Sequence, residues 1–317
     1  MSSGLRRYIL VFFILLTLLC SSFTAFAADK ITIASVSWTG VTIKSELAVS
    51  VLEGLGYKAE NKVFSVPIAY SALSTGDADV FFGNWMPSMA NIANKFFAGG
   101  KVIKYVANMP NAKYTLATPT FCAEEGLKDF TDIVKFGDQL DWKIYGIEPG
   151  NDGNMIIQKM IDNNMFGLGK FELVASSEVA MLAQVQAYAQ NHKAIVFLGW
   201  APHSMNERID MTYLTGSTAQ TFGENDGTAT VWTNLRKGFK EENPNVARLF
   251  KNMLFPVTMM NQIMTSVHVS KGLGLHQAGL KWLKEHPATY EKWLTGVTTS
   301  DGSLAIPALR AYLESKI

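Results

Sequence analysis

The apolar residues of this chain follow two alternating patterns: short runs rich in β-branched residues, and longer stretches in which they recur three or four positions apart. Residues 30–37 (KITIASVS) predict a strand, which stops at Trp38-Thr39-Gly40. Thr42 is expected to cap a helix that ends at Gly56. The apolar positions of that helix are Leu47, Val51, Leu52 and Leu55.

The same alternation continues along the chain. Further strands are predicted at 62–66, 79–82, 143–147, 172–175 and 194–198, and helices at 67–74, 154–163 and 179–190. After Pro244 the pattern becomes helical, at 247–254, 259–268, 275–285 and 288–294. Strands that alternate with helices are typical of mostly parallel sheets covered by helices on both faces. The predicted fold class is therefore α/β.

The N-terminus has the three parts of a secretory signal peptide. A basic start at Arg6-Arg7 precedes an almost unbroken apolar run at 8–19, and Ala25-Phe26-Ala27 matches a small-residue cleavage site. The run is shorter than the roughly 20 apolar residues that a membrane-spanning helix needs. We therefore predict a signal peptide at residues 1–27 and a periplasmic location.

Composition and charge narrow the function classes. The 317 residues include 28 Lys+Arg and 27 Asp+Glu, a formal net charge of +1, with 17% charged and 48% hydrophobic residues. A chain this apolar is expected to fold, and a charge this small argues against a nucleic-acid partner.

The two cysteines indicate neither a disulfide scaffold nor a Cys-rich metal site. A lipid anchor at Cys20 is not expected, because the bulky Leu19 precedes it where lipoprotein signals carry a small residue. Cys122 is the only thiol beyond the signal peptide, and we interpret it as an inert, partly buried side chain.

One local pattern occurs twice. Residues 80–89 (VFFGNWMPSM) and 195–205 (IVFLGWAPHSM) each combine a buried-type strand, a glycine, a tryptophan, a proline and a methionine. Trp38 also stands between a strand and a helix. Ligands of open α/β sheets bind beyond the carboxyl ends of the strands, so we expect Trp38, Trp85 and Trp200 to share one site. The alternative for each tryptophan is ordinary core packing.

Motifs for catalysis and for cofactor or metal binding are missing from the sequence. It has no G-x-S-x-G, H-E-x-x-H or G-x-x-x-x-G-K-[ST] motif, and its five histidines do not cluster. The segment 148–154 (EPGNDGN) lacks the spacing of a calcium-binding loop. It reads better as a polar turn in which Asn151 or Asp152 caps the next helix, with amide groups free to orient a ligand. We therefore predict no catalytic residues, no cofactor and no metal.

Tryptophans around a crevice suit a quaternary ammonium ligand, which cannot donate a conventional hydrogen bond and is attracted to ring faces. Each ring contributes roughly 0.5–2 kcal/mol. Burial of the methyl groups can bring the total to about −8 kcal/mol, a micromolar affinity.

Several longer motifs lead to a family resemblance. They are Ser37-Trp38-Thr39, residues 64–67 (FSVP), 83–87 (GNWMP), 112–118 (AKYTLAT), 143–154 (KIYGIEPGNDGN), 196–200 (VFLGW) and 294–299 (LTGVTT). With these motifs the chain resembles the periplasmic substrate-binding proteins of ABC importers for choline, glycine betaine and carnitine, nearest to the choline-binding branch.

The resemblance implies a two-lobe, type II-like periplasmic binding protein with a ligand cleft between lobes joined by crossover strands. We expect residues 28–114 plus 213–317 to form lobe 1 and residues 115–212 to form lobe 2. It also implies that the closed form docks on an ABC permease in the inner membrane. We expect the binding protein itself to be a monomer.

Site residues follow from the same resemblance. Trp38, Trp85, Tyr114 and Trp200 match the positions of an aromatic box, and Asn151 matches a position that hydrogen-bonds the polar end of the ligand. Tyr114 emerges only from this resemblance.

Gly40 departs from the pattern, because choline-binding members carry an aspartate there. Glycine removes a charge that would repel a ligand carboxylate and leaves backbone N–H groups at the start of a helix. We therefore expect a preference for zwitterions, glycine betaine or carnitine, with choline as the other candidate.

Three other interpretations stay open at this point. The same scaffold could bind another amine or an amino acid such as proline, which would make the ring electrostatics unimportant. The chain could be an exported enzyme acting on a methylated amine. The tryptophans could be core residues of a protein that functions only through partner contacts.

Overall fold

The computed structural model describes residues 30–269 and 273–317. The predicted signal peptide at residues 1–27, including Cys20, lies outside the described residues. None of the helices within the described ranges is long and apolar enough to cross a membrane.

A single mixed sheet runs through the molecule, in the strand order β2-β1-β3-β9-β4-β7-β5-β6, with β8 paired to β4. The strands are β1 Ile31–Ser35, β2 Ala59–Val63, β3 Val80–Met86, β4 Val102–Pro119, β5 Lys143–Tyr145, β6 Glu172–Val174, β7 Val196–Ala201, β8 Met211–Tyr213 and β9 Thr228–Arg236. The outer strands pair in parallel, β1 with β2 and β3, and β5 with β6 and β7. The central β4 and β9 pair antiparallel with their neighbours, so the expectation of mostly parallel strands holds only toward the two ends of the sheet.

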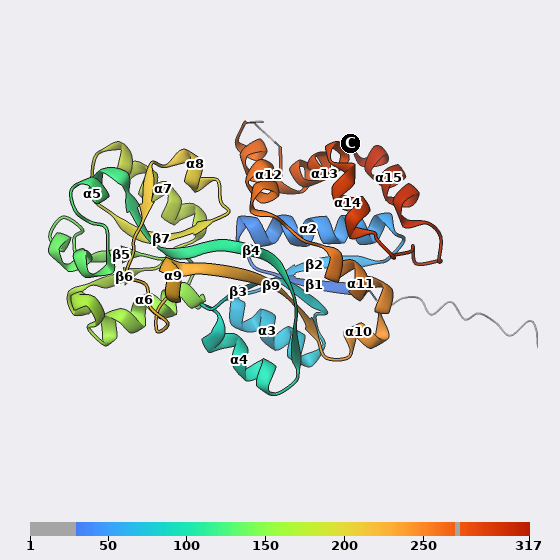
Figure 1. The fold of residues 1–317 in the computed structure, drawn as a ribbon, viewed down its shortest axis with the longest axis horizontal. Coiled ribbons are helices and arrows are strands. Elements are labelled where there is room, and N and C mark those ends of the chain that lie inside the picture. Colours follow the sequence, from blue (N-terminus) through green and yellow to red (C-terminus); the bar gives the residue numbers. More distant parts are fainter. Residues whose placement is uncertain (1–29, 270–272) are drawn as a thin grey trace, which may run out of the picture.

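Helices cover both faces of this sheet, as predicted (Figure 1). In lobe 1, α2 and α12 to α15 lie on one face while α3 and α4 lie on the other. The helices are α2 Thr39–Gly54, α3 Val66–Thr75, α4 Ala90–Ala98, α5 Thr120–Glu124, α6 Asp152–Asp162, α7 Glu178–Gln190, α8 Met205–Arg208, α9 Glu224–Gly227, α10 Phe239–Glu242, α11 Pro244–Asn252, α12 Val257–Val269, α13 Leu275–Glu285, α14 Pro287–Trp293 and α15 Ala305–Lys316. Short 3-10 helices occupy Phe130–Phe136 and Met165–Lys170.

The two lobes are joined by β4 and β9. The 18-residue β4 pairs with β9 at its lobe 1 end, from Val102↔Arg236 to Lys113↔Thr228, and with β7 at its lobe 2 end. Figure 1 shows both strands passing side by side from one lobe to the other. These strands are the crossover connections that the family resemblance implies.

The lobe boundaries near Tyr114 and Thr212 stay a prediction. Backbone hydrogen bonds join Leu214 to Leu116 and Thr215 to Lys128, each at 2.9 Å. These bonds attach the segment after β8 to lobe 2 and favour a return crossing nearer to β9.

Several predicted element bounds need correction, among them those of the first helix and the second strand. The first helix begins at Thr39, with the extended Trp38 at its N-cap position, so Thr42 lies inside the helix and does not cap it. The first backbone N–H of this helix, that of Thr39, donates to a carboxylate of lobe 2 that is described below. The strand predicted at 62–66 lies at 59–63, because residues from Val66 onward form α3.

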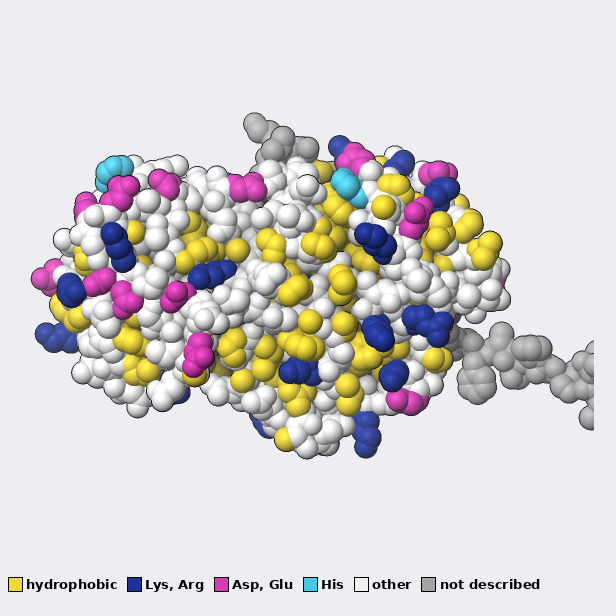
Figure 2. Space-filling model, in the orientation of Figure 1, with side chains coloured by type: hydrophobic (Ala, Val, Ile, Leu, Met, Phe, Trp, Pro, Cys, Tyr) yellow, Lys and Arg dark blue, Asp and Glu magenta, His cyan; other side chains and the backbone are white. Residues whose placement is uncertain are grey.

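Surface charge is mixed on the face seen in Figure 2, where Lys and Arg side chains are interspersed with Asp and Glu over both lobes. Cys122 is buried in lobe 2 and burial raises the pKa of its thiol, which lowers the fraction present as reactive thiolate.

Gly227 lies directly before β9 and close to Tyr114 of β4, and it allows a test of this crossover. Its φ is +75°, and a Cβ there would lie 2.3 Å from the backbone oxygen of Tyr114. Gly100 has a similar φ of +62°, but a Cβ added there would meet nothing within 4 Å, and it therefore serves as the matched control. Gly100→Ala should lower the free energy of unfolding by about 1–2 kcal/mol, the cost of left-handed backbone alone.

Gly227→Ala should cost clearly more, because backbone must move in addition, and urea denaturation measures both variants. Equal losses would show that the close approach to Tyr114 carries no energetic weight.

Candidate ligand-binding site

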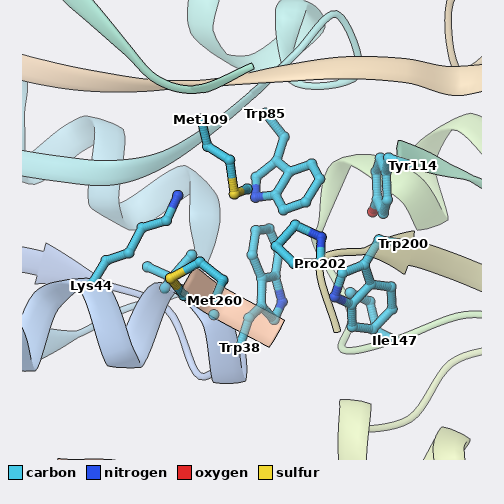
Figure 3. Close-up of a pocket in the computed structure, with 11 residues that line it drawn as sticks. Trp38, Lys44, Trp85, Met109, Tyr114, Ile147, Trp200, Pro202 and Met260 are labelled. Carbon is cyan, nitrogen blue, oxygen red and sulfur yellow. The ribbon is translucent and has the colours of Figure 1, made fainter. Parts of the chain in front are cut away.

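A cavity lies between the lobes, and four aromatic rings form much of its wall (Figure 3). Five of the six predicted site residues line it: Trp38, Gly40, Trp85, Tyr114 and Trp200. The other lining residues are Val41, Lys44, Met109, Ile147, Pro202 and Met260. The four rings, called here the pocket rings (Trp38, Trp85, Tyr114 and Trp200), are each only 5–8% exposed. Any charge held between them is therefore largely shielded from water.

The sheet determines where the pocket rings lie. Trp85 belongs to β3 of lobe 1, Tyr114 to the crossover strand β4, and Trp200 to β7 of lobe 2. Tyr114 and Trp200 are direct partners in the β4–β7 ladder, and their ring centroids are 6.4 Å apart. The Tyr114 ring is 5.7 Å from that of Trp85, at an interplanar angle of 48°. These rings are tilted instead of stacked in parallel, so they do not cover one another's faces.

Trp38 joins the group from the start of α2, where lobe 2 holds it in place. Its Nε1 donates a hydrogen bond of 2.7 Å to Oε1 of Glu148, in the turn between β5 and α6. The next residue, Thr39, donates its backbone N–H (3.2 Å) and its hydroxyl to Glu178 of α7. Both carboxylates belong to lobe 2, so the lobes are in contact across the cleft.

Glu178 is itself positioned by His203. The imidazole Nε2 lies 3.0 Å from Oε1 of Glu178, and Nδ1 accepts a hydrogen bond from the Met205 backbone N–H. Because Nδ1 is the acceptor, the Nε2–H of His203 points at Glu178. One buried carboxylate thus receives donors from both lobes.

Negative charge gathers behind Tyr114. Asp152 begins α6, and burial raises the pKa of its carboxyl group to about 6. Burial also raises the pKa of Glu148. The Tyr114 hydroxyl and both carboxylate oxygens of Asp152 have no hydrogen-bond partner within the described part of the chain. The result is a buried acidic region at the ring end of the cavity, where a cation would be stabilised.

Asn151 has a structural role that the sequence also predicted. It is the N-cap residue of α6, where its Oδ1 accepts the Asn154 backbone N–H at 2.9 Å and its Nδ2 donates to the Glu148 carbonyl. It does not line the cavity. A hydrogen bond from Asn151 to the ligand stays a prediction.

Among the lining residues that the sequence analysis missed, Lys44 is the charged one. It lies on α2, four residues after Gly40 and three before Leu47, so it shares a helix face with a pocket residue and a core residue. Its side chain is 2% exposed, and burial lowers the pKa of the ammonium group to about 7. The sequence feature that could have identified Lys44 is its position on the apolar stripe of a helix.

Across residues 30–269 and 273–317, no three His, Cys, Asp or Glu side chains are grouped so that they could hold a metal ion. The arrangement instead offers a shielded, ring-lined cavity with acidic groups at one end and a lysine in its wall.

Comparisons with known proteins identify the family and the fold of this chain. Residues 29–285 match the family model described as the substrate binding domain of the ABC-type glycine betaine transport system. A solved ABC-transporter choline binding protein in complex with choline is 44% identical, with a TM-score of 0.86, over 90% of this chain and 98% of that one. This similarity confirms the predicted two-lobe α/β fold.

Two further relatives are transport binding proteins. The glycine betaine/carnitine transport binding protein of Listeria monocytogenes is 28% identical over 166 residues, which are 52% of this chain and 53% of that protein. The glycine betaine/proline betaine-binding periplasmic protein of Salmonella typhimurium is 24% identical, over 86% of this chain and 92% of that protein.

Asp152→Asn tests the buried negative charge, since it keeps the shape of the side chain and removes the charge. The folded carboxyl group titrates near 6 and the ordinary value is 3.8, so its ionisation costs stability as the pH rises from about 4 through 6. At about pH 8 the variant should therefore gain up to about 3 kcal/mol in free energy of unfolding.

Below about pH 4 that difference should vanish, because the wild-type carboxyl group is then protonated in both states. Urea denaturation of the ligand-free protein across this range is the measurement, with the exposed Asp210→Asn as the control. A variant that is no more stable than wild type near pH 8 would contradict the assignment of a destabilising buried charge.

Proposed function

The chain belongs to the substrate-binding family of ABC-type glycine betaine transport systems, and on that premise we propose that its pocket rings form an aromatic box for a quaternary ammonium ligand. The observation that carries this proposal is the convergence of four nearly buried rings from both lobes on one cavity. A trimethylammonium group offers no hydrogen bond, so ring faces and burial of its methyl groups must supply the affinity.

Electrostatics supports the same ligand class. The ring quadrupoles attract a cation, and the carboxyl groups of Asp152 and Glu148 lie on the Tyr114 side of the box, where burial above all, and then these two charges, raise the pKa of the Tyr114 hydroxyl. The low exposure of the rings strengthens each of these attractions relative to water. An uncharged ligand of the same shape would not gain these electrostatic attractions.

Within this class the favoured ligands are the zwitterions glycine betaine and carnitine. Gly40 places no carboxylate in the cavity wall, so nothing at that position repels an anionic group. The backbone N–H groups of Gly40 and Val41 have no hydrogen-bond acceptor in the described chain. Choline is the second candidate, because a relative 44% identical to this chain binds it.

Ligand binding and lobe closure are linked in this proposal. Trp38 and Trp85 come from lobe 1 and Trp200 from lobe 2, so the box is complete only when the lobes meet. A ligand that touches both lobes binds the closed state better and thereby shifts the population toward it. Substrate-binding proteins of this family bind a small ligand and work with an ABC permease, and the closed form is the one that would dock on it.

We also propose a cellular location, an oligomeric state and a functional class for the chain. The chain is exported to the periplasm by its N-terminal signal, as the periplasmic relative suggests, and acts as a monomer. We propose that it is a carrier and not an enzyme, since its homologues are transport binding proteins.

Trp38→Leu and Trp85→Leu test the aromatic box. Each should weaken binding of glycine betaine and carnitine by about 2- to 30-fold, the worth of one cation–π contact, in calorimetric titrations run in parallel with choline. Trp142→Leu, which removes a tryptophan of lobe 2 outside the cavity, is the control and should leave affinity unchanged.

Retained affinity in both box variants would favour another cargo such as proline. No heat with any of the three ligands, after co-purified ligand has been removed, would reject the quaternary ammonium class altogether.

Gly40→Asp tests the basis of ligand preference. A Cβ at this position meets only the Cε of Met264, at 3.2 Å, so the end of one flexible side chain must give way. The new carboxylate should repel a ligand carboxylate and raise the affinity for choline relative to glycine betaine by about tenfold or more. Gly40→Asn supplies the same bulk without the charge and is the matched control. Unchanged relative affinities in Gly40→Asp would contradict the role assigned to this position.

A further inference from the structure

Lys44 is a buried cation in the wall of the cavity. Its Nζ donates to Oδ1 of Asn108 at 2.8 Å and lies 5.3 Å from the centroid of the Phe255 ring. Asn108 is fully buried, and its Nδ2 lies 3.2 Å from the carbonyl of Phe82 and 3.0 Å from the hydroxyl of Thr233. The amide is therefore oriented with its oxygen toward the ammonium group.

This ammonium group has no carboxylate partner among the described residues. From other elements, the ammonium group contacts the neutral side chains of Asn108 and Phe255. On α2 itself, Glu46 faces elsewhere, because it pairs with His276 of α13 and accepts from Asn61 of β2. A buried charge that lacks a counterion is costly unless something supplies one.

The lining of the cavity carries different charges at its two ends. Figure 3 shows Lys44 at one end of the lining and Tyr114 and Trp200 at the other, with Trp38 and Trp85 between them. The acidic region behind Tyr114 and the ammonium group of Lys44 thus lie at opposite ends of the cavity. Such a polarised cavity complements a molecule with a cation at one end and an anion at the other.

We propose that Lys44 is a specificity-determining residue that binds the anionic end of the ligand, so that the transported class is the trimethylammonium carboxylates. This inference rests on the proposed function, since it requires the cationic end in the aromatic box. Gly40 and Val41, one helical turn before Lys44, also line the cavity, and their backbone N–H groups, unpaired in the described chain, are further donors at the start of α2. Choline has no anionic end and leaves the lysine without a counterion.

A consequence is proton uptake on binding. The pKa of Lys44 is near 7 in the empty cavity because burial disfavours the charged form. A carboxylate placed beside it stabilises the ammonium form and raises this pKa. At about pH 8 the empty site is mostly neutral, so a zwitterion should bind together with up to one proton.

At the acidic end of the cavity, ligand binding is expected to release protons instead of taking them up. A cation in the box lowers the raised pKa values of Asp152 and Glu148 and releases protons from them, and for Asp152 this release falls mainly near pH 6 and below. Near pH 8 the group with a pKa of about 6 is already ionised, so the Lys44 contribution stands apart there.

The test is calorimetric titration of the full-length mature protein near pH 8 with glycine betaine, carnitine and choline, in buffers of different ionisation enthalpy. Proton uptake with both zwitterions and none with choline is expected, and equal proton uptake with all three would overturn the proposal. This arm uses the wild-type protein and does not depend on a variant that folds.

Lys44→Met provides the second arm, since methionine keeps much of the apolar stem and removes the charge. It should lose at least about tenfold in affinity for the zwitterions and less than about twofold for choline, and zwitterion binding should lose its proton uptake. Lys104→Met, an exposed lysine on β4, is the matched control and should change nothing. An equal loss for choline and the zwitterions would overturn the role of Lys44 while leaving the aromatic box intact.

Discussion

The exclusion of water from the space between four rings is the constraint on which the rest of the structure depends. Ring faces attract a cation weakly when water competes for it, and more strongly when the site is shielded. Each of these rings is less than a tenth exposed, and this burial requires both lobes, because β3 and β7 reach the cavity from opposite sides of the crossover. The fold therefore serves to bring two half-sites together around the ligand.

The buried charges of this site are unfavourable for the free energy of folding. Asp152 and Lys44 are both nearly excluded from water and lack full partners, which disfavours their charged forms. Each would be removed by selection for stability alone. At opposite ends of one cavity, however, they match the two ends of a zwitterion, and the ligand would supply the counterions that the protein does not.

Sequence reasoning grouped the three tryptophans, which the structure places on one cavity, but it did not find Lys44 in the same lining. The role of these tryptophans in ligand binding stays a prediction. Trp85 and Trp200 follow a repeated strand–Gly–Trp–Pro pattern that marks strand ends, whereas Tyr114 sits in β4, which Pro110 makes look like a loop. Because of the same proline, the sequence analysis did not predict the crossover strand β4 itself. The sequence analysis did not select Lys44, because lysines beside an apolar stripe usually extend their ammonium group to solvent. Only the tertiary contacts with Asn108 and Phe255 show that the ammonium group of Lys44 is buried.

The most direct test of the central claim compares glycine betaine with 3,3-dimethylbutanoate, in which carbon replaces the quaternary nitrogen. The two molecules share shape and carboxylate, so their apolar burial and their contacts at the anionic end are alike. If the rings and acidic groups recognise positive charge, calorimetry should give glycine betaine an affinity at least about tenfold higher. Equal affinities would show that the cavity selects shape and carboxylate alone, and would contradict the account.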